Sequence, residues 1–290
     1  MVLKTVGILS LGEMGEQWAR VLAFHGVCVC TCSSGRSPRT SEAAQRCGAL
    51  EMENVEALVQ ASDLIVSLVP AQASLEVGRR VAEAMKRTGS RPLFLESNGI
   101  SPTRAEEIAG LVAEAGGDCV DGGVIGPASQ LTQGTFTVLS GPRASELETL
   151  GSLGLSVEVV GDKVGQASAL KMLNIGLFHG LTTLMLELLF GARRLGILPQ
   201  ALTLYSRRLP ELFERLPPLV KNTPRQAERR AHEMAELLEI FANVDFGPHS
   251  LAASRDILSE IARAAPSQAQ EWNETITRFT EFRSGRTSAT

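Results

Sequence analysis

The sequence predicts two domains: an α/β domain built on a doubly wound, mostly parallel sheet, followed by an all-α domain. Three observations support this prediction. Short apolar runs alternate with helical stretches through the first half of the chain. A glycine loop directly follows the first apolar run. Strand signals end near Gly161 and every later stretch is helical in period, so we expect domains at 1–161 and 162–290.

The first domain is expected to alternate strands with helices. Its fourth helix has the clearest start, because Ser101 can act as N-cap and Pro102 suits the first helical position. The expected strands are Thr5–Ser10, Val27–Cys32, Leu64–Leu68, Pro92–Glu96, Cys119–Asp121, Thr135–Ser140 and Ser156–Val160. The expected helices are Gly15–His25, Ser41–Cys47, Ala73–Arg87 and Pro102–Ala115.

The second domain is expected to contain helices alone. The first is long and apolar and should connect the two domains. Loops are expected at Pro217-Pro218 and at Phe246-Gly247-Pro248. The polar tail after Pro266 is expected to fray. The expected helices are Val164–Leu195, Leu202–Leu216, Pro224–Asn243 and Ser250–Ala264.

Composition and charge narrow the classes of function. The chain has 290 residues, of which 44% are hydrophobic and 21% charged, and its net charge is −4. This balance gives no electrostatic reason to expect nucleic acid or an anionic membrane as a partner. We expect no apolar run to span a bilayer, and Met1–Ser10 lacks the features of a signal peptide. A soluble, cytoplasmic protein is therefore expected.

Three of the five cysteines alternate along one expected strand. Cys28, Cys30 and Cys32 should therefore share one face of the sheet. We interpret them as small apolar residues in a reducing compartment. A metal site would need ligands from more than a single strand, and no CxxC pair or nearby histidine supplies them, so no metal is expected.

The loop after the first strand is a variant of the dinucleotide-binding fingerprint GxGxxG. Ser10 stands at the first glycine position, and Gly12 and Gly15 stand at the other two. We expect Gly12 to let the backbone approach a pyrophosphate, and Gly15 to let the next helix pack against the strand with its amides toward the phosphates. The loop lies between a strand and a helix, which favours a Rossmann domain over a plain tight turn.

The residues after the second strand favour NADP over NAD. NAD-specific folds usually carry an acid there for the ribose hydroxyls, whereas this chain reads CSSGRS from Cys32 and has none. Arg36 can stack on the adenine and pair with a 2′-phosphate, and the hydroxyls of Ser33 and Ser34 can donate to it. A solvated loop arginine is the alternative. NADP, or NADPH, is the expected cofactor.

A series of short segments between Val6 and Met172 is recognisable as a set. The most specific stretch is Gln166–Lys171, within the segment Gly165–Met172 (GQASALKM). The other segments are Gly12–Gly15, Arg36–Pro38, Ser67–Pro70, Ile100–Pro102 and Asp121–Pro127. In this order they resemble the β-hydroxyacid dehydrogenase superfamily, which includes 3-hydroxyisobutyrate and 6-phosphogluconate dehydrogenases. Arg230–Ala262 resembles the helical domain of a phosphogluconate-dehydrogenase-like branch. The resemblance covers nearly the whole chain.

The resemblance implies that Lys171 is the catalytic acid/base. It lies in the first turns of the long helix, where an ammonium group can bond a substrate oxygen and pass a proton as hydride moves. A lysine lying along a helix surface is the alternative. The apolar neighbours Ala167, Leu170 and Met172 argue against a freely solvated position.

The resemblance also implies two sets of binding residues. We expect the cofactor to be held by Leu9, Ser10, Leu11, Gly12, Glu13, Met14, Ser33, Ser34, Arg36, Val69, Pro70 and Asn98. Of these, Asn98 should lie near the nicotinamide ribose. We expect the substrate side to be lined by Gly122, Gly123, Val124, Ile125, Gly126, Asn174, Ile175 and Phe178.

Departures from the family's pattern bear on the substrate. Many relatives carry Asn four positions after the lysine, where this chain has Ile175, with Asn174 one place earlier. Relatives with a Ser-Gly-Gly carboxylate clamp have Ser and Gly where this chain has Ile125 and Pro127, which removes a hydroxyl and an N–H donor. We therefore expect a larger or more apolar pocket. His179 is either a contact to substrate, a second proton carrier or a structural residue.

The expected function is reversible hydride transfer between NADP(H) and a hydroxy or oxo substrate, with Lys171 moving the proton. An imine reductase on the same architecture is one alternative, although imine reductases of this superfamily usually replace the lysine. A non-catalytic NADP(H)-binding protein is another, since Ser10 and Ile175 would fit a loss of activity. The resemblance also implies a homodimer whose helical domain contributes to the partner's cleft.

Overall fold

The computed structural model describes residues 1–33, 38–242, 244–264 and 272–287. Contacts divide the chain into two compact units, Met1–Met172 and Leu173–Thr290. The sequence predicted a domain boundary near Gly161, and in the structure the first turn of the long helix, with Ala167 and Ser168 buried, belongs to the first unit. We call the two units the Rossmann unit and the helical unit, and each is described by itself.

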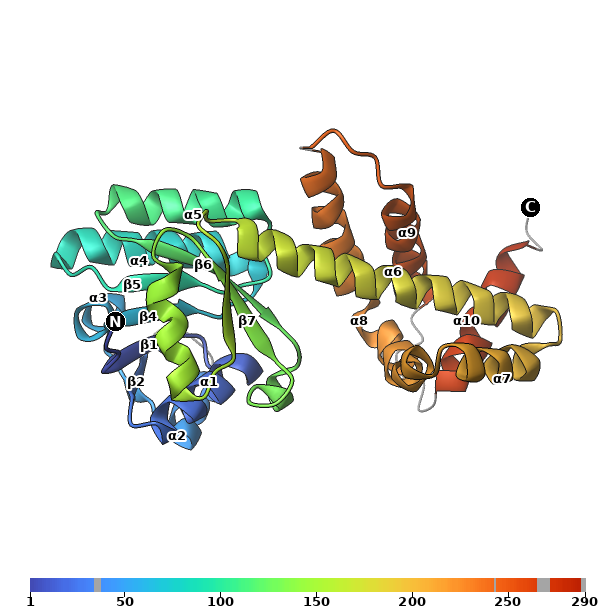
Figure 1. The fold of residues 1–290 in the computed structure, drawn as a ribbon, viewed down its shortest axis with the longest axis horizontal. Helices are drawn as coiled ribbons and strands as arrows, with labels where there is room; N and C mark the ends of the chain where they lie inside the picture. The colour runs from blue at the N-terminus through green and yellow to red at the C-terminus, as the bar shows by residue number, and fades with distance from the viewer. Residues whose placement is uncertain (34–37, 243, 265–271, 288–290) are drawn as a thin grey trace. The chain divides into compact units, whose positions relative to one another are not determined.

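The Rossmann unit is built on an eight-stranded sheet with the order β3-β2-β1-β4-β5-β6-β7-β8 (Figure 1). Neighbouring strands are parallel except β6 and β7, which are antiparallel. The strand order reverses at β1, so the carboxyl ends of β1 and β4 border the point where such folds bind ligands. The strands are β1 (Thr5–Leu9), β2 (Cys28–Thr31), β3 (Leu50–Glu51), β4 (Leu64–Ser67), β5 (Leu93–Glu96), β6 (Cys119–Ile125), β7 (Phe136–Ser140) and β8 (Val157–Gly161).

Helices cover both faces of this sheet, which confirms the predicted doubly wound class. Alternation along β1 places Ile8 in one apolar cluster, with Trp18 and Leu22, and Leu9 in the other, with Leu58. Figure 1 shows α4 and α5 side by side on one face. The helices are α1 (Glu13–Phe24), α2 (Pro38–Cys47), α3 (Val55–Ala61), α4 (Ser74–Thr88) and α5 (Pro102–Glu114), with 3-10 segments η1 (Ala71–Ala73), η2 (Ala128–Gln130) and η3 (Ala144–Leu153).

One β-strand and one α-helix of the Rossmann unit have no counterpart among the expected elements. They are the edge strand β3 and the helix α3, which Asn54 caps by accepting a hydrogen bond from the Ala57 N–H at 2.8 Å. Elements this short show too little periodicity to be recognised from a sequence. Strand β6 also runs on to Ile125, beyond the expected end at Asp121, because its residues 121–125 pair with β7.

Helix α6 (Gln166–Arg194) begins in the Rossmann unit and continues into the helical unit. Contrary to expectation, it is long and apolar enough to cross a membrane by length and composition alone. Core helices of soluble proteins satisfy the same test, and part of α6 is buried: Leu186 and Leu189 lie fully inside the apolar core of the helical unit.

The helical unit also contains α7 (Leu198–Arg208), α8 (Pro210–Ala242), α9 (His249–Ala264) and α10 (Trp272–Thr287). The loop expected at Pro217-Pro218 is wrong, because α8 continues through it; the buried face that includes Val220, Ala227 and Met234 outweighs the cost of interior prolines. The expectation that the tail frays is also wrong for 272–287. There α10 buries Ile276 and Phe279 in the core.

Candidate functional site

The glycine loop between β1 and α1 has an unusual backbone. Ser10, at the first glycine position, has a φ of 86°, a left-handed conformation that favours glycine. Gly15 has no space for a side chain, since a Cβ there would lie 2.1 Å from the Ser10 carbonyl oxygen. Helix α1 therefore packs directly against the turn, as close helix–strand packing in this fold requires.

The same loop fits the diphosphate of a dinucleotide. A Cβ on Gly12 would meet nothing within 4 Å, so the space beside this backbone is open. Gly12 is the N-cap of α1, and no side chain caps the helix there. The first N–H groups of a helix carry partial positive charge and bind phosphate groups. Leu9 and Leu11 have their side chains in the core, so only their backbone can reach a ligand.

At the end of β2 the structure describes Ser33, whereas Ser34 and Arg36 lie outside the described residues. The Ser33 hydroxyl donates a hydrogen bond to the Glu51 carboxylate. A polar pocket of about 190 Å³ lies beside the preceding residue, Cys32, and includes Asn54 and Arg80 in its lining. This end of the sheet thus holds hydroxyls, an arginine and an acid.

Asn98 connects the end of β4 to the predicted catalytic lysine. Its side-chain Oδ1 accepts a hydrogen bond from the Val69 N–H at 2.7 Å, and its Nδ2 donates to the Ser67 hydroxyl at 2.9 Å. Its backbone carbonyl accepts from Lys171 Nζ at 3.3 Å. The structure therefore brings together three residues that the sequence assigned to one site: Val69, Asn98 and Lys171.

Asp121 fixes the start of α6, the helix that carries Lys171. The buried carboxylate accepts the N–H groups of Gly165 and Ser168, each at 2.9 Å, and the Ser168 hydroxyl at 2.6 Å. Ser140 donates to the same carboxylate at 3.2 Å, and its hydroxyl accepts the Ala167 N–H. A strand residue thus replaces the usual N-cap side chain and satisfies the orphan amides of the helix.

Glu96 is a second buried carboxyl, opposite Asp121 in the register of β5 and β6. Its Oε1 accepts the Asn98 N–H at 3.0 Å, whereas its Oε2 has no hydrogen-bond partner among the described residues. Burial raises the pKa of Glu96 to about 8, with a smaller contribution from the charge of Asp121. At neutral pH Asp121 is thus flanked by a neutral acid.

The glycines of β6 bring the sheet close to α6. A Cβ on Gly123 would lie 3.0 Å from both the Ala167 carbonyl oxygen and the Lys171 Cβ, so only glycine allows this approach. Gly126 has a φ of 124°, and a Cβ there would clash with Thr135. Val124 is buried in the core, and Ile125 ends the strand half-exposed.

Asn174, Ile175 and Phe178 lie three, four and seven positions after Lys171 on the continuous helix α6, so they share its face. All three are half-buried. His179 has a partner within the helical unit: its Nε2 lies 2.9 Å from the carboxylate of Glu233 on α8. This pairing favours the structural interpretation of the histidine.

Sequence reasoning missed Asp121, Ser140, Ser168 and Glu96. Asp121 and Ser168 lie inside the recognisable segments, but their role depends on contacts between residues far apart in the chain. For Glu96, the signal available in the sequence was an acidic residue at the end of an otherwise apolar strand. Among the described residues, no group of three His, Cys, Asp or Glu side chains could hold a metal ion.

Comparison with known proteins identifies both units. Residues 5–157 match the NAD binding domain of 6-phosphogluconate dehydrogenase, and residues 192–272 match a domain of unknown function, DUF1932. The fold and the glycine loop define a dinucleotide-binding protein with a separate helical domain. The chain belongs to the family that carries the NAD binding domain of 6-phosphogluconate dehydrogenase.

Two curated relatives are similar to this chain over different lengths. An uncharacterized 28.5 kDa protein in the 7S RNA 5′ region of Methanothermus fervidus is 25% identical over 257 residues, which is 88% of this chain and 98% of that protein. The 2-(hydroxymethyl)glutarate dehydrogenase of Eubacterium barkeri is 28% identical over 174 residues, 58% of this chain and 57% of that enzyme. Of these two relatives, the one that covers most of this chain is thus uncharacterized.

Solved structures support the hydroxyacid dehydrogenase-like fold. A conserved protein of unknown function, described as similar to 3-hydroxyacid dehydrogenases, is 28% identical with a TM-score of 0.74 and covers 89% of this chain and 96% of its own. An imine reductase from Myxococcus stipitatus in complex with NAD+ is 20% identical with a TM-score of 0.63, covering 96% and 99%. The second likeness concerns the fold alone.

Proposed function

We propose that the protein is an NADP-dependent oxidoreductase that transfers hydride between the nicotinamide and a hydroxy or oxo substrate, a carboxylic acid derivative. The observation that carries the proposal is the Lys171–Asn98–Val69 connection, which ties a lysine to the end of β4 where the cofactor is expected. Membership of a family with an NAD-binding domain supports it. The bound cofactor supplies or accepts the hydride.

In this proposal each side chain has a separate task. Lys171 bonds the substrate oxygen and moves its proton, as general base in oxidation and general acid in reduction. The Asn98 carbonyl orients the ammonium group, and Asp121 holds the helix that carries it. Gly12 and the N-terminus of α1 receive the diphosphate. Ser33, Ser34 and Arg36 are proposed to bind a 2′-phosphate, which would make NADP the cofactor.

Imine reduction on the same fold is the second candidate. Ile125 and Pro127 stand where a carboxylate clamp supplies a hydroxyl and an N–H, which favours a less polar substrate. The retained Lys171 favours carbonyl chemistry instead. A non-catalytic NADP(H)-binding role would leave Lys171 without a task.

The test is a fluorescence titration with NADPH and NADH, followed by a screen of carbonyl and imine substrates. The variant Lys171→Ala should keep its affinity for NADPH and lose turnover by roughly 10²–10⁴-fold, the usual contribution of a general acid/base. Lys163→Ala removes an exposed lysine from the residues just before α6 and is the matched control. Absence of binding to both cofactors, or full activity in Lys171→Ala, would overturn the proposal.

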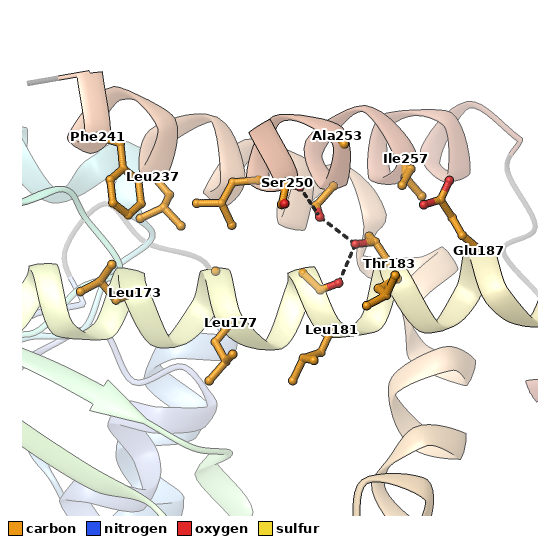
Figure 2. A pocket seen from close by; sticks show the side chains of 15 residues that line it. Leu173, Leu177, Leu181, Thr183, Glu187, Leu237, Phe241, Ser250, Ala253 and Ile257 are labelled. Atoms are coloured by element: carbon orange, nitrogen blue, oxygen red, sulfur yellow. Dashed lines mark hydrogen bonds between the residues drawn. The ribbon is translucent and has the colours of Figure 1, made fainter. Parts of the chain in front are cut away.

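We also propose that the protein is a homodimer formed through the helical unit. Leu177 and Leu184 on α6 are 59% and 52% exposed, and Leu173 and Leu188 continue the same apolar stripe. A mostly apolar pocket of about 520 Å³ lies along α6 (Figure 2), with Leu237 and Phe241 of α8 and Ser250, Ala253 and Ile257 of α9 in its lining. Such a surface is typical of subunit interfaces. A monomer by light scattering at micromolar concentration would contradict this.

A further inference from the structure

An acid from a neighbouring strand reaches the end of β2. Glu51 lies on the edge strand β3, opposite Thr31 of β2 in the register. The Glu51 Oε2 atom accepts a hydrogen bond from the Ser33 hydroxyl. The Ser41 hydroxyl, at the start of α2, lies 3.2 Å from Ser33 Oγ and 3.4 Å from the same carboxylate oxygen. Two hydroxyls thus surround one exposed carboxylate.

This position is where a Rossmann domain reads the 2′ group of the adenosine ribose. The usual acid in NAD-specific domains comes at the end of β2 itself, and the stretch from Cys32 to Ser37 contains none. Glu51 follows that stretch by many residues and reaches the site only because β3 pairs with β2. The neighbouring pocket beside Cys32 provides room for a ligand at this edge.

We propose that Glu51 weakens the binding of a 2′-phosphate and thereby sets how far the protein discriminates NADP from NAD. The inference rests on the proposed dinucleotide site. A phosphate that binds the Ser33 hydroxyl comes close to the Glu51 carboxylate, and two negative charges at such a distance repel each other. In addition, Ser33 has one hydroxyl proton and donates it to Glu51, so donation to a phosphate requires breaking that bond.

The experiment compares Glu51→Gln with the wild type by calorimetry. Gln keeps the size of the side chain and removes its charge. Adenosine 2′,5′-bisphosphate and 5′-AMP serve as probes, because they differ only in the 2′-phosphate, and NADPH and NADH are titrated in parallel. The affinity ratio of bisphosphate to AMP should rise about tenfold in Glu51→Gln, the effect of one partly solvated charge pair.

Two matched variants separate charge from structure. Glu53→Gln removes an exposed acid two residues along the chain and should leave the ratio unchanged. Glu51→Asp keeps the charge and should keep the ratio within about threefold of the wild type. The gain in Glu51→Gln should also shrink when the salt concentration is raised to about 0.5 M, since exposed charges are screened. Thermal melting checks that each variant is folded.

Each outcome bears on the proposal. If the ratio of bisphosphate affinity to AMP affinity were the same in Glu51→Gln and Glu53→Gln, or if its rise in Glu51→Gln did not respond to salt, the proposed role of Glu51 would be overturned. The proposed function would not be affected by either result. Absence of binding of all four ligands to the wild type would overturn both this inference and the proposed function. Binding with the expected ratios but without Lys171-dependent turnover would leave Glu51 established and remove the proposed reaction.

Discussion

Among the residues that the structure describes, the Rossmann unit and the helical unit each bury one ionisable side chain that has a polar atom without a hydrogen-bond partner. The two side chains differ in how burial affects their charge. Glu96 in the Rossmann unit is fully buried, and burial raises its pKa to about 8, so it carries a proton at neutral pH. Arg230 on α8 is 6% exposed, and burial lowers its pKa to about 10, so it stays charged. At neutral pH the buried carboxyl of the Rossmann unit is therefore uncharged, whereas the buried guanidinium of the helical unit is charged.

The surroundings of the two groups also differ. Glu96 lies beside Asp121, which accepts hydrogen bonds from the start of α6 and from Ser140 of β7. Arg230 donates only to the uncharged Thr223 and Gln226, at 2.7 and 3.1 Å, among the described residues, and its Nε has no partner there. The comparison indicates that polar groups of the Rossmann unit are placed to position other residues, whereas Arg230 costs stability in the isolated chain.

The largest expected effect is the loss of stability when a methyl group is added next to rigid backbone, compared with one added next to a flexible side chain. In Gly15→Ala the new Cβ meets the Ser10 carbonyl oxygen at 2.1 Å, and backbone cannot move aside, so a loss of about 3 kcal/mol or more is expected. In Gly176→Ala on α6 the obstacle is the flexible end of Leu237, and the loss should be about 1 kcal/mol. Urea denaturation measures both. Equal losses would refute the contrast.

The second prediction concerns the cap of α6. Asp121→Ala leaves two buried N–H groups without an acceptor, which should cost roughly 3 kcal/mol. In the helical unit, Ser254→Ala removes the 2.8 Å bond from Thr183 and should cost about 1 kcal/mol. Asp121→Asn keeps one oxygen and should recover more than half of the loss. Similar losses of stability in Asp121→Ala and Ser254→Ala would contradict the expectation that the Asp121 network contributes more than a single hydrogen bond.

The third prediction is a pH dependence that belongs to Glu96. Below the ordinary carboxyl pKa both folded and unfolded states hold the proton, so the group has no net effect. As pH rises from the ordinary carboxyl pKa to about 8, the unfolded state gives up its proton while the folded state keeps it, so stability falls, on the order of 3 kcal/mol in all. Above about 8 both states are ionised and the group causes no further fall. Glu96→Gln should lack this fall. Parallel pH profiles of the two proteins would contradict the assignment.

The smallest expected effect is a gain. Arg230→Met replaces the buried guanidinium by an apolar side chain of similar length and should stabilise the protein by about 1–2 kcal/mol at neutral pH. The midpoint of urea denaturation measures it, with the exposed Arg229→Met as control. A loss of stability instead would contradict the view that burying this charge costs stability.

Much of the fold could be predicted from the sequence because it depends on local periodicity. The alternation of apolar strands and helices gave the doubly wound class, and Gly12 and Gly15 marked the nucleotide loop. The prediction failed at β3 and α3, which are too short to show a period, and at α8, where tertiary burial outweighs two prolines. It also missed α10, which buries Ile276 and Phe279 in the core.

The residues of the candidate site also fall into two groups: those that local sequence patterns predict and those that only contacts in the folded chain reveal. The sequence by itself predicted Lys171 as the catalytic residue and located the glycine loop and the strands around it, because a motif and a period are properties of neighbouring residues. Only the tertiary structure decided that Asn98 connects Val69 to Lys171, that Asp121 caps α6 and that Glu51 stands beside Ser33. These contacts join residues far apart in the chain, and their geometry depends on which strands pair and how closely a helix can approach the sheet.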